Sequence, residues 1–184
     1  YQGALMVPTS VLASQHFRTL LTISKDLELN ISLLTGATKK SDRKKILSNL
    51  ENGLTDIIIG THALIEDSVV FNNLGLVVID EQHKFGVNQR LKLLKKGQNP
   101  HLLSMTATPI PRTLSITYHG DMDLSIIDEL PSNRIPVTTK IVDKSKIEKV
   151  YGFIKDQIAL GKQAIIVYPL VKESEKTDLA AAIQ

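Results

Sequence analysis

The chain has 184 residues, of which 42% are hydrophobic and 22% are charged, and its formal net charge is +3. This composition is enough for one folded domain and part of a second, and it excludes a disordered tail. Disulfide bonds and cysteine-ligated zinc are excluded because the chain has no cysteine. Its apolar stretches fall short of the roughly 18 residues that span a bilayer, and no signal peptide is recognisable, so we expect a cytoplasmic protein without a membrane partner.

The net positive charge permits a polyanionic partner without requiring one. Basic residues cluster in three places, which are Lys39-Lys40, Arg43-Lys44-Lys45, and Lys92 with Lys95-Lys96. Such clusters are common on solvated helix faces, and we expect that role rather than the tracking of phosphates. The histidines at positions 16, 62, 83, 101 and 119 lack the spacing of metal ligands, and for four of them we expect a surface or capping role.

Short apolar runs alternate with amphipathic stretches along the first part of the chain. Thr9 or Ser10, and later Ser41, are suitable N-caps for helices, and Gly53 is a natural C-terminal stop. The predicted strands cover residues 4–7, 31–34, 56–60, 77–79 and 101–105, and the predicted helices cover residues 11–27, 41–52, 87–96 and 111–118. This alternation is typical of a doubly wound α/β fold with a parallel sheet.

The segment 131–137 contains two prolines and no helical periodicity, which predicts a hinge or linker. After it we expect a strand at 137–142, an amphipathic helix at 145–160 and a strand at 164–167. The last residues before Gln184 fit a further helix. A second α/β lobe is therefore expected to begin after the linker.

The apolar run 77–79 is followed directly by Asp80, Glu81, Gln82 and His83. In parallel sheets, ligands bind outside the carboxyl ends of the strands, so chemistry is expected at these residues. An aspartate at a strand end suits a magnesium ion that carries nucleotide phosphates, and an adjacent glutamate can polarise an attacking water. The alternative is a carboxylate pair that only caps the next helix.

A second apolar run ends in Thr106-Ala107-Thr108-Pro109-Ile110-Pro111-Arg112-Thr113-Leu114. Hydroxyl groups at a strand end can hydrogen-bond a phosphate, a water or a carboxylate, and the two prolines favour the start of a helix. Together, this segment and Asp-Glu-Gln-His resemble motifs III and II of superfamily 2 helicases.

Further segments narrow the resemblance to the RecG family of bacterial branch-migration helicases. They are Met6-Val7-Pro8-Thr9 with Leu12-Ala13 and Gln15-His16 as motif Ia, Leu34-Thr35-Gly36 as motif Ib, residues 59–65 as the next block, residues 80–87 with Gln89-Arg90, Asp128-Glu129-Leu130-Pro131 and residues 134–139. The transcription-repair coupling factor shares the Thr-Pro-Ile-Pro-Arg-Thr-Leu segment but lacks the Asp-Glu-Leu-Pro continuation. It is one alternative, and a non-enzymatic α/β binding module is another.

The resemblance implies that ATP and Mg²⁺ are the cofactors. Asp80 would hold the magnesium ion, usually through water, and Glu81 would orient or activate the hydrolytic water. Gln82 and His83 would contact the phosphates or relay their state to the following strand. Thr106-Ala107-Thr108 would couple the ATP state to lobe movement, unless these residues only stabilise the end of the strand.

For DNA, the resemblance implies sequence-independent contacts to the backbone at successive strand ends. The positions that match the DNA face of related helicases are Pro8, Thr9, Gly36, Thr61 and His62. Each of them could instead be a plain turn residue at the end of a strand.

The resemblance also implies a RecA-like parallel-sheet helicase lobe with the P-loop NTPase fold at residues 1–130, the linker at 131–137, and the start of a second RecA-like lobe at 138–184. The sequence contains no Gly-x-x-x-x-Gly-Lys-Ser/Thr loop. We therefore expect an internal fragment that lacks its P-loop segment, folds marginally and hydrolyses no ATP by itself.

The full-length protein is expected to be a monomeric ATP-dependent DNA helicase. By resemblance, it would remodel stalled replication forks and Holliday junctions in DNA repair and recombination. Branched DNA would be its substrate, with replication or single-strand-binding proteins as further partners.

Overall fold

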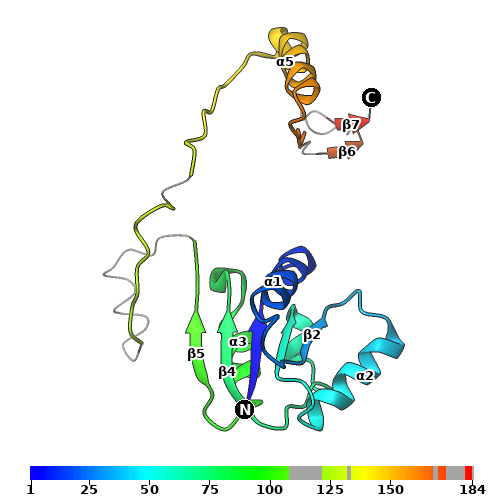
Figure 1. Ribbon diagram of the computed structural model, residues 1–184, viewed down its shortest axis with the longest axis vertical. Helices are drawn as coiled ribbons and strands as arrows, with labels where there is room; N and C mark the ends of the chain where they lie inside the picture. The colour runs from blue at the N-terminus through cyan, green and yellow to red at the C-terminus, as the bar shows by residue number, and fades with distance from the viewer. Residues whose placement is uncertain (108–121, 132–133, 168–169, 173–180, 184) are drawn as a thin grey trace. The chain divides into compact units, whose positions relative to one another are not determined.

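The computed structural model describes residues 1–107, 122–131, 134–167, 170–172 and 181–183, and it is shown in Figure 1. The chain divides into two compact units, Tyr1–Asp123 and Leu124–Gln184. The predicted helix at 111–118 and the predicted site residue Thr108 lie outside the described residues. None of the described helices is long and apolar enough to cross a membrane.

The first unit is built on a five-stranded parallel sheet. Its strands are β1 (Gln2–Met6), β2 (Ile31–Leu34), β3 (Ile57–Gly60), β4 (Leu74–Ile79) and β5 (His101–Ser104), in the order β2-β3-β1-β4-β5. Every neighbouring pair is parallel. Figure 1 shows the arrowheads of the labelled strands at one end of the sheet. The predicted parallel α/β fold is thereby confirmed.

Three α-helices and two short 3₁₀-helices connect the strands. They are α1 (Ser10–Ile23), α2 (Lys40–Glu51), η1 (His62–Ile65), η2 (Gln82–Lys84) and α3 (Val87–Leu94). Thr9 caps α1, because its hydroxyl accepts a hydrogen bond from the Leu12 amide at 3.2 Å. Gly53 follows α2 in the left-handed conformation, with φ of 73°. The predicted cap and the predicted stop are both confirmed.

Two predicted helix boundaries are wrong. Helix α1 ends at Ile23 rather than at residue 27, because the Ser24 hydroxyl bonds to the Leu20 carbonyl at 2.6 Å and the chain then turns. Helix α2 is preceded by Lys39 as its N-cap, so Ser41 lies inside the first turn, where its hydroxyl bonds to Asp42. Caps depend on the direction in which the chain enters the helix, and local sequence does not set that direction.

The sheet has an apolar core on each face, as the alternation of side chains along a strand requires. Helix α1 covers one core and packs on residues from β1 to β4. Helices α2 and α3 cover the other, larger core. The first core contains Leu5, Val7, Ala13 and Ile59, and the second contains Ala4, Met6, Leu34, Leu50, Ile58, Ala63, Leu64, Val69, Phe71, Leu74, Val77, Ile79, Phe85 and Leu93.

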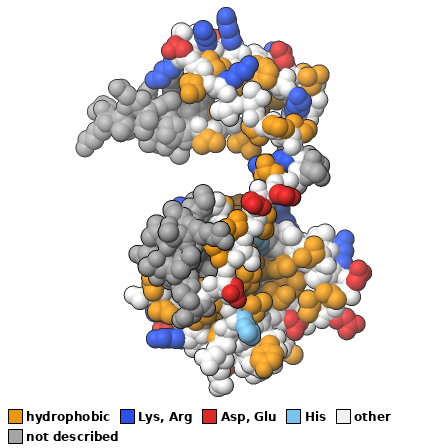
Figure 2. Space-filling view, turned by 90° about the vertical axis from the view of Figure 1, so that its left-hand side faces the viewer, with side chains coloured by type: hydrophobic (Ala, Val, Ile, Leu, Met, Phe, Trp, Pro, Cys, Tyr) orange, Lys and Arg blue, Asp and Glu red, His pale blue; other side chains and the backbone are white. Residues whose placement is uncertain are grey.

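The β5 side of the first unit exposes apolar surface. Figure 2 looks onto this side and shows hydrophobic side chains on it. Leu76 on β4 and Leu103 on β5 are 44% and 51% exposed. They lie on the face that α1 covers elsewhere, because Leu103 pairs in register with Val78, which packs against the first core. Among the described residues, β5 is the edge strand on this side.

Gln2 ties the opposite, amino-terminal ends of the strands together. It is buried, and its side-chain amide donates to the carbonyls of Leu50 and Thr55 at 2.9 and 2.8 Å. Its amide oxygen accepts from the Asn73 amide at 3.0 Å. One polar side chain therefore satisfies three backbone groups from three different segments, which holds the sheet in register.

The second unit contains η3 (Lys144–Lys146), α5 (Ile147–Ala159) and the parallel strands β6 (Leu170–Lys172) and β7 (Ala181–Ile183). Asp143 precedes η3, and its hydrogen bonds with Ser145 lower the pKa of the Asp143 carboxyl. The predicted helix at 145–160 is confirmed, with Gly161 in the left-handed conformation after it.

Three other predictions for this unit are wrong. Residues 137–142 and 164–167 are not strands, although both runs are rich in β-branched residues. An isolated strand is unstable without a neighbour to pair with, and Ile141 and Ile165 are almost fully exposed in the structure. At the end of the chain, residues 181–183 form a strand rather than part of a helix.

Candidate nucleotide and nucleic-acid site

The predicted site residues of the first unit follow the carboxyl ends of strands, apart from Thr108, which lies outside the described residues. Because the five strands are parallel, these residues lie along one edge of the sheet. Pro8 and Thr9 follow β1, Gly36 follows β2, Thr61 and His62 follow β3, Asp80 to His83 follow β4, and Thr106 and Ala107 follow β5.

Asp80 is placed directly beyond β4 and is held at both ends. Its amide donates to the Met6 carbonyl of β1 at 3.0 Å. One carboxylate oxygen, Oδ1, accepts from the Glu81 amide at 2.8 Å. The other, Oδ2, lies 3.0 Å from Nε2 of His16 on α1. The side chain is 21% exposed, so the carboxylate is restrained but still reachable from solvent.

Glu81 has the left-handed backbone conformation, with φ of 50° and ψ of 49°. For a residue with a side chain this conformation is strained, and such strain is often found at functional sites. The turn it makes brings the Gln82 amide to the Met105 carbonyl at 3.1 Å, which joins the loop after β4 to the end of β5. Sequence reasoning did not predict this turn.

The Glu81 carboxylate has a spare acceptor. Its Oε2 atom is buried and has no hydrogen-bond partner among the described residues. Nδ1 of His83 lies 3.4 Å from this atom, and the two atoms do not form a hydrogen bond. A buried carboxylate oxygen with an unused lone pair is suited to accept a hydrogen bond from a water molecule.

Gln82 and His83 point to different partners. Gln82 is buried, and its amide oxygen accepts from Nη1 of Arg90 on α3 at 3.1 Å. His83 is exposed, and its Nδ1 lies 3.3 Å from the Thr106 hydroxyl beyond β5. The loop after β4 therefore touches the loop after β5 through a side chain as well as through the backbone. The sequence indicates Arg90 only through the family resemblance, and the structure shows that it binds Gln82 in the site.

The predicted DNA-contact residues differ in their accessibility. Gly36 and His62 are exposed, and Pro8 is half-buried. Thr9 is exposed, but its hydroxyl is engaged in capping α1. Thr61 is only 4% exposed, and its Oγ1 atom is buried without a partner among the described residues. In this conformation the side chain of His62 is available to a phosphate and the hydroxyl of Thr61 is not.

Gly60 explains why the loop after β3 can sit so close to its neighbours. A Cβ atom at this position would clash with the Leu34 carbonyl oxygen of β2 and with the Leu64 side chain of η1. Only glycine allows this approach. The close packing places Thr61 and His62 beside the loop that follows β2.

A hollow of about 520 Å³ lies between the start of α1 and the loop after β2. Its lining includes Ser14, Gln15 and Arg18 of α1, together with Thr35 and Ala37. The hollow adjoins Thr9 and Gly36 in sequence, and it offers a hydroxyl, an amide and a guanidinium. Sequence reasoning missed Ser14 and Arg18, although their spacing from Ser10 by four and eight residues puts all three on one helix face.

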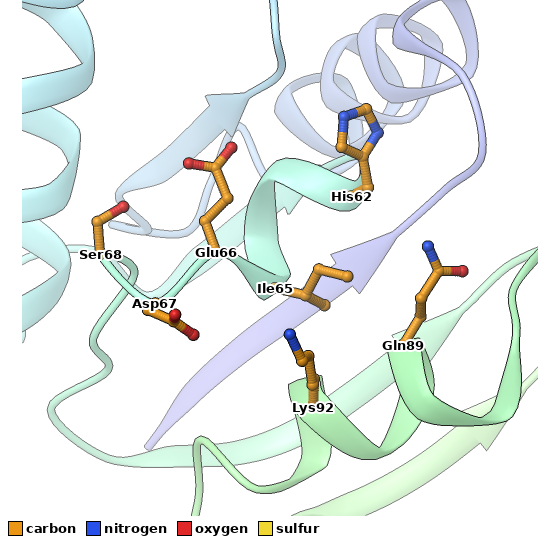
Figure 3. Close-up of a pocket in the computed structure, with 7 residues that line it drawn as sticks. All are labelled: His62, Ile65, Glu66, Asp67, Ser68, Gln89 and Lys92. Carbon is orange, nitrogen blue, oxygen red and sulfur yellow. The ribbon is translucent and has the colours of Figure 1, made fainter.

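A second hollow, of about 540 Å³, lies between the η1 segment and α3. Figure 3 shows Lys92 and Gln89 of α3 on one side of it and Glu66 and Ser68 on the other, with His62 near one end. Its lining mixes positive and negative charge, so it favours no single ligand class. Nearby, partial burial lowers the pKa of Lys96, which donates to the carbonyls of Glu66 and Val69.

The residues at the end of β4 fit a magnesium ion. Within the described residues no group of three or more His, Asp or Glu side chains is arranged to hold a metal. Magnesium does not need such a group, because it keeps several waters and binds through one or two carboxylates and the phosphates of a nucleotide. Asp80 supplies an accessible carboxylate with lone pairs left over from its two hydrogen bonds.

Comparison with known proteins decides the family. A family model described as DEAD/DEAH box helicase matches residues 1–116. The chain belongs to this helicase family. A solved structure, that of the DUF1998 helicase MrfA bound to DNA, shares the fold at 17% identity, with a TM-score of 0.51 over 65% of this chain and 18% of that one.

Within the family, the chain is similar to proteins named ATP-dependent DNA helicase RecG. It is 51% identical to that of Synechocystis sp. and 47% identical to that of Thermotoga maritima over 184 residues, which are 100% of this chain and 22% and 24% of those proteins. A solved structure of RecG bound to a three-way DNA junction is 46% identical, with a TM-score of 0.71 over 93% of this chain and 23% of that one. The predicted RecG resemblance is confirmed, and the chain spans about a quarter of the length of these relatives.

Proposed function

We propose that this chain is a motor segment of an ATP-dependent DNA helicase of the RecG type. One observation carries the proposal. His83, which follows the two carboxylates beyond β4, has its Nδ1 atom 3.3 Å from the hydroxyl of Thr106 beyond β5. Motif II and motif III residues are thus in contact at the edge of the sheet where nucleotides bind in such folds.

In this proposal, Asp80 would hold the magnesium ion through water, and the ion would neutralise charge on the ATP phosphates. Glu81 uses its spare Oε2 to accept a proton from, or to orient, the attacking water. The His83–Thr106 contact passes a change at the phosphates to the end of β5. Gln82 stabilises this loop through its hydrogen bond with Arg90 rather than by contacting the phosphates.

DNA would lie along the ends of β1, β2 and β3. The hollow beside Gly36 presents Ser14 and Arg18, and His62 is exposed at the next strand end. Hydroxyl groups and a single cation suit contacts with a phosphate backbone and carry no base code, so binding would be independent of sequence. The RecG relative bound to a three-way junction supports branched DNA as the substrate.

The broader role that we propose is the one that the resemblance of the sequence to the RecG family implies. We infer remodelling of stalled forks and Holliday junctions in DNA repair and recombination, in the cytoplasm, by a monomer that meets replication or single-strand-binding proteins. The relatives named above are RecG proteins, so a transcription-repair coupling factor and a non-enzymatic binding module are not favoured.

The test uses the full-length helicase that carries this chain. Glu81→Gln keeps the size of the side chain but removes the carboxylate, so it should retain ATP binding and lose hydrolysis by at least about a hundredfold. Glu28→Gln, at an exposed position between α1 and β2, is the matched control and should hydrolyse ATP normally. ATP turnover and unwinding of a three-way junction are the measurements. Normal turnover in Glu81→Gln would remove the water-activating role of Glu81.

A further inference from the structure

The contact between His16 and Asp80 links two segments that are 64 residues apart. His16 lies in the middle of α1, the helix that follows β1. Asp80 lies beyond β4, and β4 is the neighbour of β1 in the sheet. Nε2 of His16 and Oδ2 of Asp80 are 3.0 Å apart, and the two side chains are 30% and 21% exposed. A contact this short and partly shielded restricts both side chains.

The direction of this hydrogen bond follows from the chemistry of the acceptor. An ionised carboxylate has only lone pairs, so the imidazole must donate through Nε2. The other oxygen, Oδ1, already accepts from the Glu81 amide at 2.8 Å. With one donor on each oxygen, the plane of the carboxylate is set, and each oxygen keeps a lone pair for the waters of a magnesium ion.

The same helix borders the hollow at the end of β2. Gln15, the residue before His16, lines that hollow, as do Ser14 and Arg18 within two positions. The amino terminus of α1 is fixed by the Thr9 cap at the end of β1. Since one helix of 14 residues carries both sets of side chains, a ligand that shifts α1 at the hollow also shifts the donor to Asp80.

We propose that His16 is a positioning residue: it orients the Asp80 carboxylate toward magnesium and ties this orientation to the position of α1. The inference rests on the proposed function, because it takes Asp80 as the magnesium carboxylate. It adds a residue of motif Ia to the nucleotide site. The general precedent is that groups which hydrogen-bond a metal-binding side chain affect metal affinity or activity by about 10- to 100-fold.

The experiment compares His16→Leu with His16→Gln in the full-length helicase. Leucine fills a similar space without a donor, whereas the amide of glutamine reaches about as far as Nε2 and can donate. His101→Gln, at an exposed position on β5, is the histidine control. Two quantities are measured: the Mg²⁺ concentration that gives half-maximal ATP hydrolysis, and the affinity for a fluorescent ADP analogue with Mg²⁺ and with EDTA.

His16→Leu should raise the half-saturating Mg²⁺ concentration by about tenfold. It should weaken ADP binding in Mg²⁺ but not in EDTA, and it should reduce the factor by which DNA stimulates hydrolysis. His16→Gln should restore most of each quantity. In an Asp80→Asn background, His16→Leu should not raise the half-saturating Mg²⁺ concentration any further, because the negative charge of the acceptor at position 80 is gone.

An unchanged magnesium requirement in His16→Leu overturns the proposal. A loss of hydrolysis in His16→Leu without a change in its magnesium requirement also overturns the proposal. So does a loss of hydrolysis that is equal in His16→Leu and His16→Gln, because either result indicates that His16 only packs against its neighbours. If His16→Leu does not fold, His16→Asn replaces it, since its shorter amide cannot reach Asp80. Raised magnesium requirement in His16→Asn alone supports the proposal, and equal behaviour of His16→Asn and His16→Gln refutes it.

Failure of the proposed function gives a different result. If the wild-type helicase hydrolyses no ATP with Mg²⁺, the assignment of Asp80 is wrong and the role of His16 falls with it. If the wild type is active and requires Mg²⁺ but the His16 variants match it, only the positioning role is refuted.

Discussion

The left-handed conformation of Glu81 predicts an unusual order of stability between two variants. Glu81→Gly and Glu81→Ala both remove the carboxylate, so their difference reports on the backbone alone. For a residue with a Cβ atom, the left-handed conformation costs about 1 to 2 kcal/mol, which glycine avoids. Glycine loses about 0.5 to 1 kcal/mol more than alanine in conformational entropy on folding. Glu81→Gly should therefore be the more stable variant, by about 0.75 kcal/mol at the midpoints of these ranges and by up to about 1.5 kcal/mol.

Gly36 provides the matched comparison. Its φ is outside the left-handed region, and a Cβ atom there would meet nothing within 4 Å. At such a position alanine should be more stable than glycine by about 0.4 to 1 kcal/mol. The same exchange of glycine for alanine should thus have opposite signs at positions 36 and 81.

The assay is urea unfolding at 25 °C, followed by circular dichroism, of Glu81→Gly, Glu81→Ala, Gly36→Ala and the wild type. Their midpoints can be compared only if their m-values are equal. If Glu81→Ala is as stable as Glu81→Gly or more so, the backbone at Glu81 is not strained. The interpretation of this turn as stored strain at the proposed catalytic carboxylate would then be refuted.

Two further predictions concern the fold and the proposed DNA contacts at the strand ends. Gln2→Leu should lower the free energy of unfolding by about 3 kcal/mol, because it leaves three backbone groups without their partner, whereas Gln98→Leu, at an exposed position, should change urea unfolding little. Gly36→Glu should weaken the binding of labelled duplex DNA and flatten its salt dependence, measured by fluorescence anisotropy at two salt concentrations. The control Gly152→Glu makes the same charge change on α5 of the second unit. Gly36→Glu should lose more DNA affinity than Gly152→Glu. An equal loss of affinity in both variants would reflect net charge alone and would contradict the second prediction.

The elements of the first unit were largely predictable because their signals are local. Apolar runs such as 31–34 are short and bounded by turn residues, and the structure forms a strand over the same four residues. Helix α1 carries its own cap at Thr9, and the glycine at position 53 ends α2 as predicted. The boundaries that were wrong, at residue 27 and at Ser41, depend on how the chain enters or leaves the helix.

The second unit shows where local signals fail. Residues 137–142 have the β-branched composition of a strand, but a strand needs a partner edge, and composition does not supply one. The helix over 147–159 has its own amphipathic pattern and was predicted within a few residues. Helices satisfy their backbone groups internally, so they tolerate the loss of distant context better than strands do.

The sequence by itself determined which chemical groups stand at the ends of the strands. The change from an apolar run to Asp80 and Glu81, and from another run to Thr106, is a feature of adjacent residues, so it could be interpreted without coordinates. Parallel alternation then placed these groups at one edge of a sheet.

Only the tertiary structure decided which of these groups meet. The order β2-β3-β1-β4-β5 puts β1 beside β4, so that the helix after β1 brings His16 to Asp80 across 64 residues of sequence. The left-handed turn at Glu81 and the His83–Thr106 contact likewise depend on β5 lying next to β4. Strand order is set by the packing of whole faces against helices, a property of the assembled chain that adjacent residues do not encode.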